Sequence, residues 1–309
     1  MSKSLNQGIM FAIGAAVISG VANYANGMVV RGIDPLVHNV VKNGLVGVAM
    51  LVILLVTAEW RTLGKLKPKQ WRNLGLVALI GGSIPFWLFF TGVKQIGGVE
   101  GSMIHKSLIF WVALMAIPLL KERVGLKMWA AIGLLYLSNM AAGFTGFKTL
   151  GIAHLMVLSA TMFWAVENIL VKKTLTGVPV NVVVTARMLG GAVILAGILV
   201  ASGKAPLVSQ LTTSQWWMLM GVALLLFGYV STWYRALQLA PVTVVAGILV
   251  GATVVTTMLE AVLRTKTVSL GAVVQGTMMI TGIYLVVTAV KDWKALGDRA
   301  TTFWKPKIS

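Results

Sequence analysis

The chain contains no cysteine, which excludes disulfides, thiolate metal sites and cysteine nucleophiles. Acidic residues are few, with eight Asp and Glu against 26 Lys and Arg, and no cluster of aspartates is available to hold Mg²⁺. The patterns GxxxxGK[ST], HExxH and GxSxG are also missing. We therefore expect no enzyme: no catalytic residue, no metal site and no cofactor. Without an ATP site, any uphill movement of a solute must draw on a gradient or on exchange.

Polar sequence is scarce as well. Of 309 residues, 11% are charged and 58% are apolar, and uncharged runs such as 45–58, 74–92 and 268–290 exceed what a soluble core needs. A helix of about 20 residues crosses a hydrocarbon core of about 30 Å, whereas the alternating stretches of a membrane β-barrel are missing. The sequence predicts an all-α integral membrane protein with ten transmembrane helices, near 9–30, 36–58, 73–93, 98–120, 127–144, 151–171, 179–201, 215–237, 242–263 and 268–290.

The ten segments form two sets of five, with landmarks that recur about 143 residues apart, such as Gln95 with Gln238 and Val99 with Val242. Because five is odd, the second set enters the membrane from the opposite face. This pattern predicts two inverted five-helix repeats around a central cavity, a frequent plan of secondary transporters. We place the repeats at 1–148 and 149–290, followed by a basic cytoplasmic tail at 291–309.

The formal charge of +18 would suggest nucleic-acid binding in a soluble protein, but its distribution indicates topology. With the N-terminus in the cytoplasm, 17 Lys and Arg lie on the inner side and six in the outer loops. Short cytoplasmic loops carry such an excess. We expect a multi-pass protein of the cytoplasmic (bacterial inner) membrane, with both termini cytoplasmic, a lipid bilayer around it, no nucleic-acid partner and a functional monomer.

Three cations remain inside the predicted spans: Lys42, Lys106 and Arg187. Each lies roughly eight residues from its helix start, on the order of 12 Å deep. A charge at that depth costs at least about 2.5 kcal/mol, so it usually faces a wet cavity or a partner. The alternative for Lys42 and Lys106 is that they snorkel to the outer interface. His38 precedes Lys42 by four residues and shares its helical face, either in the cavity or as a hydrogen-bonded structural residue.

Two of these cations occupy near-equivalent positions in the two repeats. Lys42 follows Pro35 by seven residues and Arg187 follows Pro179 by eight. At most two embedded carboxylates, Glu167 among them, face three buried cations. This excess predicts a cavity of positive potential, suited to a carboxylate or a phosphate on the substrate.

Aromatic residues accompany these charges. Trp164 and Glu167 lie three residues apart on one helical face, which can hold an ammonium by charge and by cation–π attraction; packing between helices is the alternative for the tryptophan. Tyr229 and Trp233 form an i, i+4 pair that we expect to lie opposite. Trp87 follows a proline in a helix with paired glycines, where a kink would open the backbone to a ligand.

Several short motifs resemble one family. Trp164 within Met-Phe-Trp-Ala, Pro179 with Arg187, and the segment 118–122 (Pro-Leu-Leu-Lys-Glu) are similar to the drug/metabolite transporter superfamily, and within it to EamA-type permeases. The segment 100–103 (Glu-Gly-Ser-Met) followed by Trp164 resembles amino-acid exporters of the YddG type. The resemblance covers about 9–290 of the chain.

This resemblance implies a cavity built from the first four helices of each half, with Trp164 inside it. It also implies export of amino acids or related metabolites. His105 and Lys106 stand where exporters of aromatic amino acids carry aromatic or amide residues, a departure that suits smaller or charged substrates. Glu122 becomes Thr265 in the second repeat, so the two gates need not be symmetric.

The leading hypothesis is a secondary transporter that exports amino acids by alternating access. We expect one of the three buried cations to attract the substrate carboxylate, and Glu167 with Trp164 to receive the ammonium or a proton. Tyr229 and Trp233 would shape the side-chain pocket. The alternatives are a carrier of phosphosugars or nucleotide sugars, a broad drug exporter and, more remotely, an intramembrane enzyme with Glu167 or a histidine as acid or base.

Overall fold

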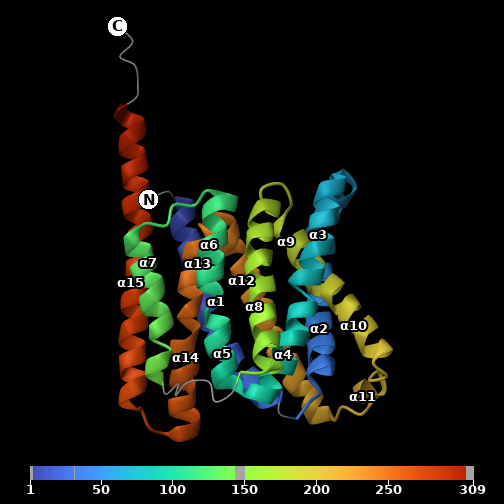
Figure 1. Ribbon diagram of the computed structural model, residues 1–309. Helices are drawn as coiled ribbons and strands as arrows, with labels where there is room; N and C mark the ends of the chain where they lie inside the picture. Colours follow the sequence, from blue (N-terminus) through green and yellow to red (C-terminus); the bar gives the residue numbers. More distant parts are fainter. Residues whose placement is uncertain (1–2, 31, 143–149, 304–309) are drawn as a thin grey trace.

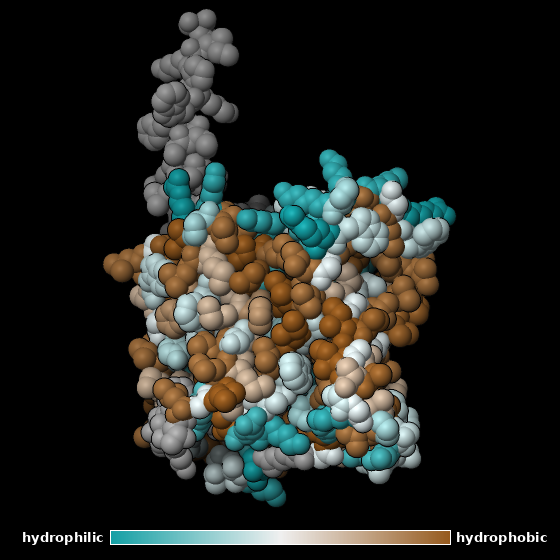
Figure 2. Space-filling model, turned by 45° about the vertical axis from the view of Figure 1, so that its right-hand side comes forward, coloured by the Kyte–Doolittle hydropathy of each residue, from teal (hydrophilic) through white to brown (hydrophobic). Residues whose placement is uncertain are grey.

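A computed structural model describes residues 3–30, 32–142 and 150–303. In these ranges the regular elements are helices, and nine helical segments are long and apolar enough to cross a membrane. A tenth, α7, is apolar but has 12 residues. Figure 2 shows a broad apolar band between two ends that carry hydrophilic residues. The prediction of an all-α, multi-pass membrane protein is confirmed.

The first half of the chain forms five membrane segments, of which the third and fourth are each divided in two. Its elements are α1 (Lys3–Val29), α2 (Pro35–Val56), the 3₁₀-helix η1 (Glu59–Lys65), α3 (Pro68–Ile80), α4 (Ile84–Ile96), α5 (Gly98–Lys106), α6 (Leu108–Leu120), α7 (Leu126–Leu137) and the short η2 (Met140–Ala142).

The second half repeats this order. Its elements are α8 (Ile152–Thr174), α9 (Val180–Thr185), the π-helical turn η3 (Ala186–Gly190), α10 (Gly191–Ala201), the short α11 (Pro206–Ser209), α12 (Thr213–Leu239), α13 (Val242–Val250), α14 (Ala252–Leu259), the π-helical turn η4 (Glu260–Thr265) and α15 (Leu270–Phe303). Helix α15 continues past 290, where the sequence suggested that the last span ends.

The two halves are inverted and exchange equivalent contacts. α1 begins at the face where α15 ends, here called the N-terminal face, whereas α8 begins at the opposite face (Figure 1). α1 packs on α12 and α14 of the other half, and α8 packs on α4 and α6 in the equivalent way. The second segments meet as α2 and α10, and the fifth as α7 and α15. The predicted inverted repeat is therefore confirmed by the packing.

Helix breaks follow the repeat in one place and violate it in another. The fourth segment of each half is interrupted, at Ser107 and at Gly251, which lie 144 residues apart. The third segment is interrupted only in the first half, at 81–83, since α12 runs unbroken for 27 residues. Pro85 explains the difference, because it lacks the N–H that a continuous helix needs and its ring crowds the preceding turn.

The start of α2 is fixed by its capping residue. Asp34 accepts hydrogen bonds from the backbone N–H of Leu36 at 2.8 Å and of Val37 at 3.4 Å. Pro35 occupies the first helical turn, where its missing N–H costs nothing. This cap orients the helix that carries four of the buried polar side chains described below.

Candidate functional site

The break between α3 and α4 lies against α8, where a tryptophan compensates for the proline. Pro85 cannot donate to the carbonyl of Gly81, four residues earlier. The indole Nε1 of Trp164 donates to that carbonyl instead, at 3.1 Å. A freed backbone group inside a membrane needs an internal partner, so this bond ties α8 to the broken helix.

Two asparagines of α2 bind the same broken segment. Asn43 donates through Nδ2 to the carbonyl of Gly82 at 3.1 Å, and Asn39 donates through Nδ2 to the carbonyl of Phe86 at 3.2 Å. The two asparagines lie four residues apart and therefore on one helical face. Their amide nitrogens are committed to the backbone, whereas their Oδ1 atoms are buried without a hydrogen-bond partner in the described part of the chain.

Paired glycines let the break approach the buried charges. A Cβ added to Gly81 would meet Cγ of Glu167 at 2.7 Å, and one added to Gly82 would collide with the backbone oxygen of Arg187. Only glycine fits this close approach. The glycines that the sequence linked to a kink thus bring the broken helix into contact with a charged pair.

Glu167 and Arg187 form that pair in the membrane interior. Nε of Arg187 lies 3.3 Å from Oε1 of Glu167, and the hydroxyl of Tyr234 donates to the same carboxylate oxygen. Glu167 is 2% exposed and Tyr234 is fully buried. Nε and Nη1 of Arg187 have no well-directed hydrogen bond among the described residues, so attraction between charges holds the guanidinium in place. The charges of this trio largely cancel.

The π-helical turn η3 carries Arg187. Pro35 and Pro179 lie 144 residues apart, but the last helical residues of these segments, Val56 and Ala201, lie 145 apart. A π-turn is one residue wider than an α-turn, which accounts for the extra residue within this segment. Such bulges are frequent at functional sites.

Lys42 is buried without an acidic partner among the described residues. Its side chain is 2% exposed, and Nζ lies 4.6 Å from the ring centre of Phe90 and 5.3 Å from that of Phe86. No ion pair involves it within the described ranges. The ring of Phe86 also lies 5.4 Å from the guanidinium of Arg187. The ring of Phe86 therefore lies between Arg187, which is paired with Glu167, and Lys42, which has no acidic partner among the described residues.

His38 lies one helical turn before Lys42. Its ring contacts the edge of Phe90 at 5.1 Å between centres, and neither ring nitrogen has a hydrogen-bond partner in the described chain. Lys42 does not snorkel to the interface, so both side chains occupy the interior.

An aromatic layer connects this group to α5. The ring of Trp164 lies 5.4 Å from Phe86, 5.3 Å from Phe89 and 5.1 Å from His105. His105 and Lys106 both border a small cavity of about 20 Å³ beside α13. Lys106 is also buried, so it does not snorkel outward.

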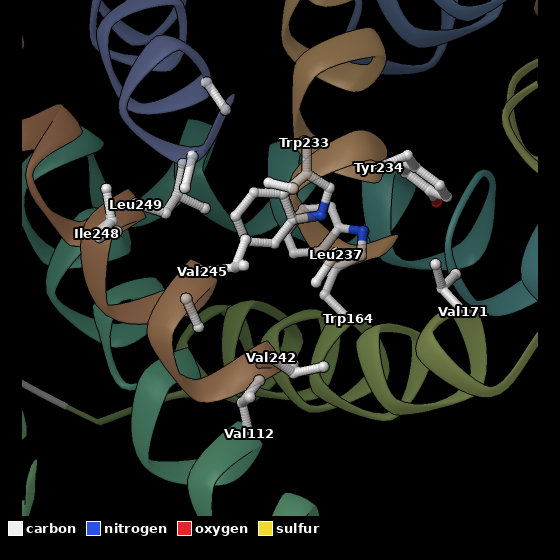
Figure 3. Packing of buried hydrophobic residues seen from close by; sticks show 14 of the residues in the cluster. Val112, Trp164, Val171, Trp233, Tyr234, Leu237, Val242, Val245, Ile248 and Leu249 are labelled. Carbon is white, nitrogen blue, oxygen red and sulfur yellow. The ribbon is translucent and has the colours of Figure 1, made fainter. Parts of the chain in front are cut away.

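The remaining predicted residues differ in their placement. Tyr229 and Trp233 of α12 are stacked, with ring centres 5.8 Å apart, and Trp233 points toward Trp164 in the core (Figure 3). The side chain of Trp87 is 37% exposed and does not join the buried cluster, by which we mean His38, Asn39, Lys42, Asn43, Phe86, Trp164, Glu167, Arg187 and Tyr234. Its neighbour Phe86 faces the charges instead.

Several residues of the cluster were missed by sequence reasoning. Tyr234 follows Trp233 directly and therefore points to another side of α12. Asn39 and Asn43 did carry a signal, since two amides spaced i, i+4 in an apolar span imply a shared polar contact. The phenylalanines of α4 carried none, because apolar aromatics in a membrane helix are ordinary.

The connection between α12 and α13 is held by a charged side chain from the α6–α7 connection and by another from α8. Glu122 accepts from Val242 N at 2.7 Å, and from Thr243 N at 3.2 Å and Thr243 Oγ1 at 2.7 Å. Nζ of Lys172 donates to the carbonyls of Leu237 and Ala240. At the opposite face, His154 instead pairs with Glu100 at 2.7 Å, which joins α8 to α5. Carboxylate–backbone hydrogen bonds thus hold the chain at one face, and a His–Glu pair holds it at the other.

The fold and this membrane-embedded cluster place the chain in a known class. The sequence profile of the EamA-like transporter family matches twice, over residues 6–142 and 151–288, so the chain belongs to this family of membrane transporters. The predicted resemblance to EamA-type permeases of the drug/metabolite transporter superfamily is confirmed. A solved crystal structure, described only as that of a protein, covers 93% of this chain and 99% of its own with a TM-score of 0.77. Its 15% identity supports a shared fold alone. No curated protein matches the chain.

Proposed function

We propose that the protein exports amino acids or related small metabolites by alternating access of the two inverted halves. The observation that carries this proposal is Lys42, a buried cation without an acidic partner in the described chain, beside a compensated Glu167–Arg187 pair. An uncompensated charge at this depth is expensive unless a ligand neutralises it. A substrate carboxylate would do so.

The acceptor atoms around Lys42 support a zwitterion over a simple anion. The Oδ1 atoms of Asn39 and Asn43, which have no hydrogen-bond partner among the described residues, require donors, and a substrate ammonium supplies them. Glu167 adds a carboxylate that attracts an ammonium or a proton once the halves move. Trp164 and the aromatic layer offer a wall for the rest of the substrate, with Tyr229 and Trp233 lining its far side.

A carrier of phosphosugars is the second candidate. Lys42 and Lys106 are both buried cations without an acidic partner in the described residues, and phosphate sites use converging cations. The carboxylate of Glu167 and the amide oxygens would repel a phosphate at close range, which favours the amino acid. A broad drug exporter would not need the two lysines.

The proposed setting is the cytoplasmic membrane with both termini inside, supported by the 17 to six distribution of Lys and Arg. A reporter fused after Ser309 is then cytoplasmic. A periplasmic reporter would reverse the proposed orientation.

The test of transport uses purified protein in liposomes and a panel of labelled amino acids, phosphosugars and cations. Amino-acid flux that disappears in Trp164→Ala and Arg187→Ala, but persists in the exposed control Trp71→Ala, supports the proposal. Flux of phosphosugars alone would favour the second candidate. Flux that neither variant changes would remove the proposed site.

A further inference from the structure

A cleft of about 340 Å³ opens at the N-terminal face, apart from the buried cluster. Its walls come from both halves of the chain: α1, η1, α9 and α12. The residues that line it are Phe11, Glu59, Pro179, Val180, Asn181, Arg235, Gln238 and Leu239. The volume suits a small molecule, and the lining combines one carboxylate, one guanidinium, two amides and an apolar remainder.

One of the two carboxylate oxygens of Glu59 has no hydrogen-bond partner among the described residues. Oε1 of Glu59 accepts from Nδ2 of Asn181 at 2.9 Å, whereas its Oε2 is buried and has no hydrogen-bond partner among the described residues. Ala58, directly before it, has a left-handed backbone with φ 57°, which ends α2 and turns the chain into η1. Non-glycine residues in that conformation are uncommon, and strained backbone of this kind clusters at ligand sites. Oε2 of Glu59 can therefore accept a hydrogen bond from a donor on a ligand, such as an ammonium.

The guanidinium of Arg235 provides the opposite charge in the same cleft. It lies over the ring of Phe11, with Cζ 5.9 Å from the ring centre, and no ion pair involves it in the described residues. Glu59 likewise has no ionic partner there, so two unlike charges line one cleft without neutralising each other. A ligand that carries both an ammonium and a carboxylate would pair with both Glu59 and Arg235.

The cleft shares its helices with the buried cluster. Asn181 precedes Arg187 by six residues, about 9 Å along the segment at helical rise. Gln238 follows Tyr234 by four residues, about 6 Å along α12. A ligand in the cleft therefore lies on the two segments that carry Arg187 and Tyr234.

We infer that this cleft is a second, vestibular binding site for zwitterionic α-amino acids, with the ammonium on Glu59, the carboxylate on Arg235 and the side chain against Phe11. The inference deepens the proposed function and rests on it for the substrate class. It assigns recognition residues that lie at the N-terminal face and act before the substrate reaches Lys42.

The natural absence of cysteine gives a direct test. Gln238→Cys places a single thiol in the cleft, and its rate of labelling by a fluorescent maleimide is measured in detergent with each common L-amino acid added. We expect at least one amino acid to slow the labelling. Two analogues of that amino acid should protect the thiol at least about tenfold more weakly: the α-amide, which lacks the carboxylate, and the deaminated acid, which lacks the ammonium. Each analogue loses one charged hydrogen bond.

Matched variants distinguish a ligand in the cleft from a ligand at the buried cluster. Glu59→Gln and Arg235→Gln should each raise the half-protecting concentration about tenfold, and Arg235→Lys less. Lys69→Cys, exposed on the same face outside the cleft, should show no protection. Protection that vanishes in Lys42→Met would place the ligand at the buried cluster and overturn the inference. Equal protection by the amide, or none by any amino acid, would do the same.

The flux assay in liposomes keeps the two proposals apart. Protection of the thiol in Gln238→Cys without amino-acid flux would support the cleft and remove the transport proposal. Flux with no protection would leave transport standing and remove the cleft.

Discussion

Glu167 and Arg187 form an ion pair whose atoms Oε1 and Nε lie 3.3 Å apart in the membrane interior. Both belong to the second half of the chain, and Tyr234 of the same half donates to the carboxylate. The first half contributes Lys42 with aromatic rings and amides, but no carboxylate among its described contacts. At the interface between the halves, the buried charges of the second half therefore largely cancel, whereas the first half carries the positive charge of Lys42.

Removal of one member of the ion pair should destabilise the protein. Glu167→Gln leaves Arg187 buried without a counter-charge, which costs about 3 kcal/mol or more. We expect the unfolding midpoint in detergent to fall, and the double variant Glu167→Gln/Arg187→Gln to recover part of the loss. If the double variant is as unstable as the sum of the single variants, the two residues are not coupled.

Lys42 should behave in the opposite way. Lys42→Met removes a buried charge that has no acidic partner in the described chain and keeps a similar length, so we expect stability equal to or above that of the natural chain. Amino-acid flux in liposomes should fall at least about tenfold, because a charge-assisted contact is lost. Lys42→Arg is the control that keeps the charge. Full flux in Lys42→Met would show that the substrate does not use this cation.

The topology could be predicted from the sequence because it follows from patterns that extend over many residues. Runs of about 20 apolar residues reflect bilayer thickness, and the odd number of helices per repeat determines the inversion. The sequence also predicted which cations lie within the membrane spans, with snorkelling to the outer interface as the alternative for Lys42 and Lys106. Lys42, Lys106 and Arg187 are all buried.

The partners of these charges could not be predicted in the same way. Contact between Glu167 and Tyr234, or between Glu122 and Val242, depends on how far each helix rotates and on where helices break. The break at 81–83 matters most, because the carbonyls of Gly81 and Gly82 in it accept from Trp164 and from Asn43. A tryptophan expected to contact substrate thus has a structural hydrogen bond as well.

That hydrogen bond predicts a rescue. Trp164→Phe leaves the carbonyl of Gly81 without its donor, at a cost of about 1–3 kcal/mol. Pro85→Ala restores a backbone N–H that can donate to the same carbonyl. We expect Trp164→Phe to cost less in the Pro85→Ala background, measured as unfolding midpoints in one detergent. An unchanged cost would mean that the indole acts through packing alone.

Glu122 should stabilise the start of α13. Its carboxylate accepts from two backbone N–H groups and one hydroxyl, so Glu122→Ala should cost at least about 1 kcal/mol. Glu122→Gln keeps one acceptor oxygen and should cost less. Glu122→Thr tests whether the residue that the second half carries here can replace it; thermal unfolding equal to that of the natural chain would show that the carboxylate is dispensable.

Asp34 predicts a pH dependence at the opposite face. Burial alone would raise the pKa of this carboxyl, but the hydrogen bond from Lys204 and those from the α2 backbone outweigh it and lower the pKa below 3.8. A carboxyl with a lowered pKa in the folded state stabilises the protein above the unfolded pKa and loses that effect as the pH falls through the folded pKa. Asp34→Ala should therefore cost about 1 kcal/mol at pH 7, with a difference that shrinks below about pH 4.

The matched control for this cap is Thr212→Ala at the start of α12. The hydroxyl of Thr212 accepts from Gln215 N at 3.2 Å without any charge, so its loss should cost a similar amount at every pH. Both variants are compared with the natural chain by thermal unfolding in one detergent from pH 7 to pH 3. If the two costs change with pH in parallel, the ionised carboxylate of Asp34 contributes nothing beyond an ordinary helix cap.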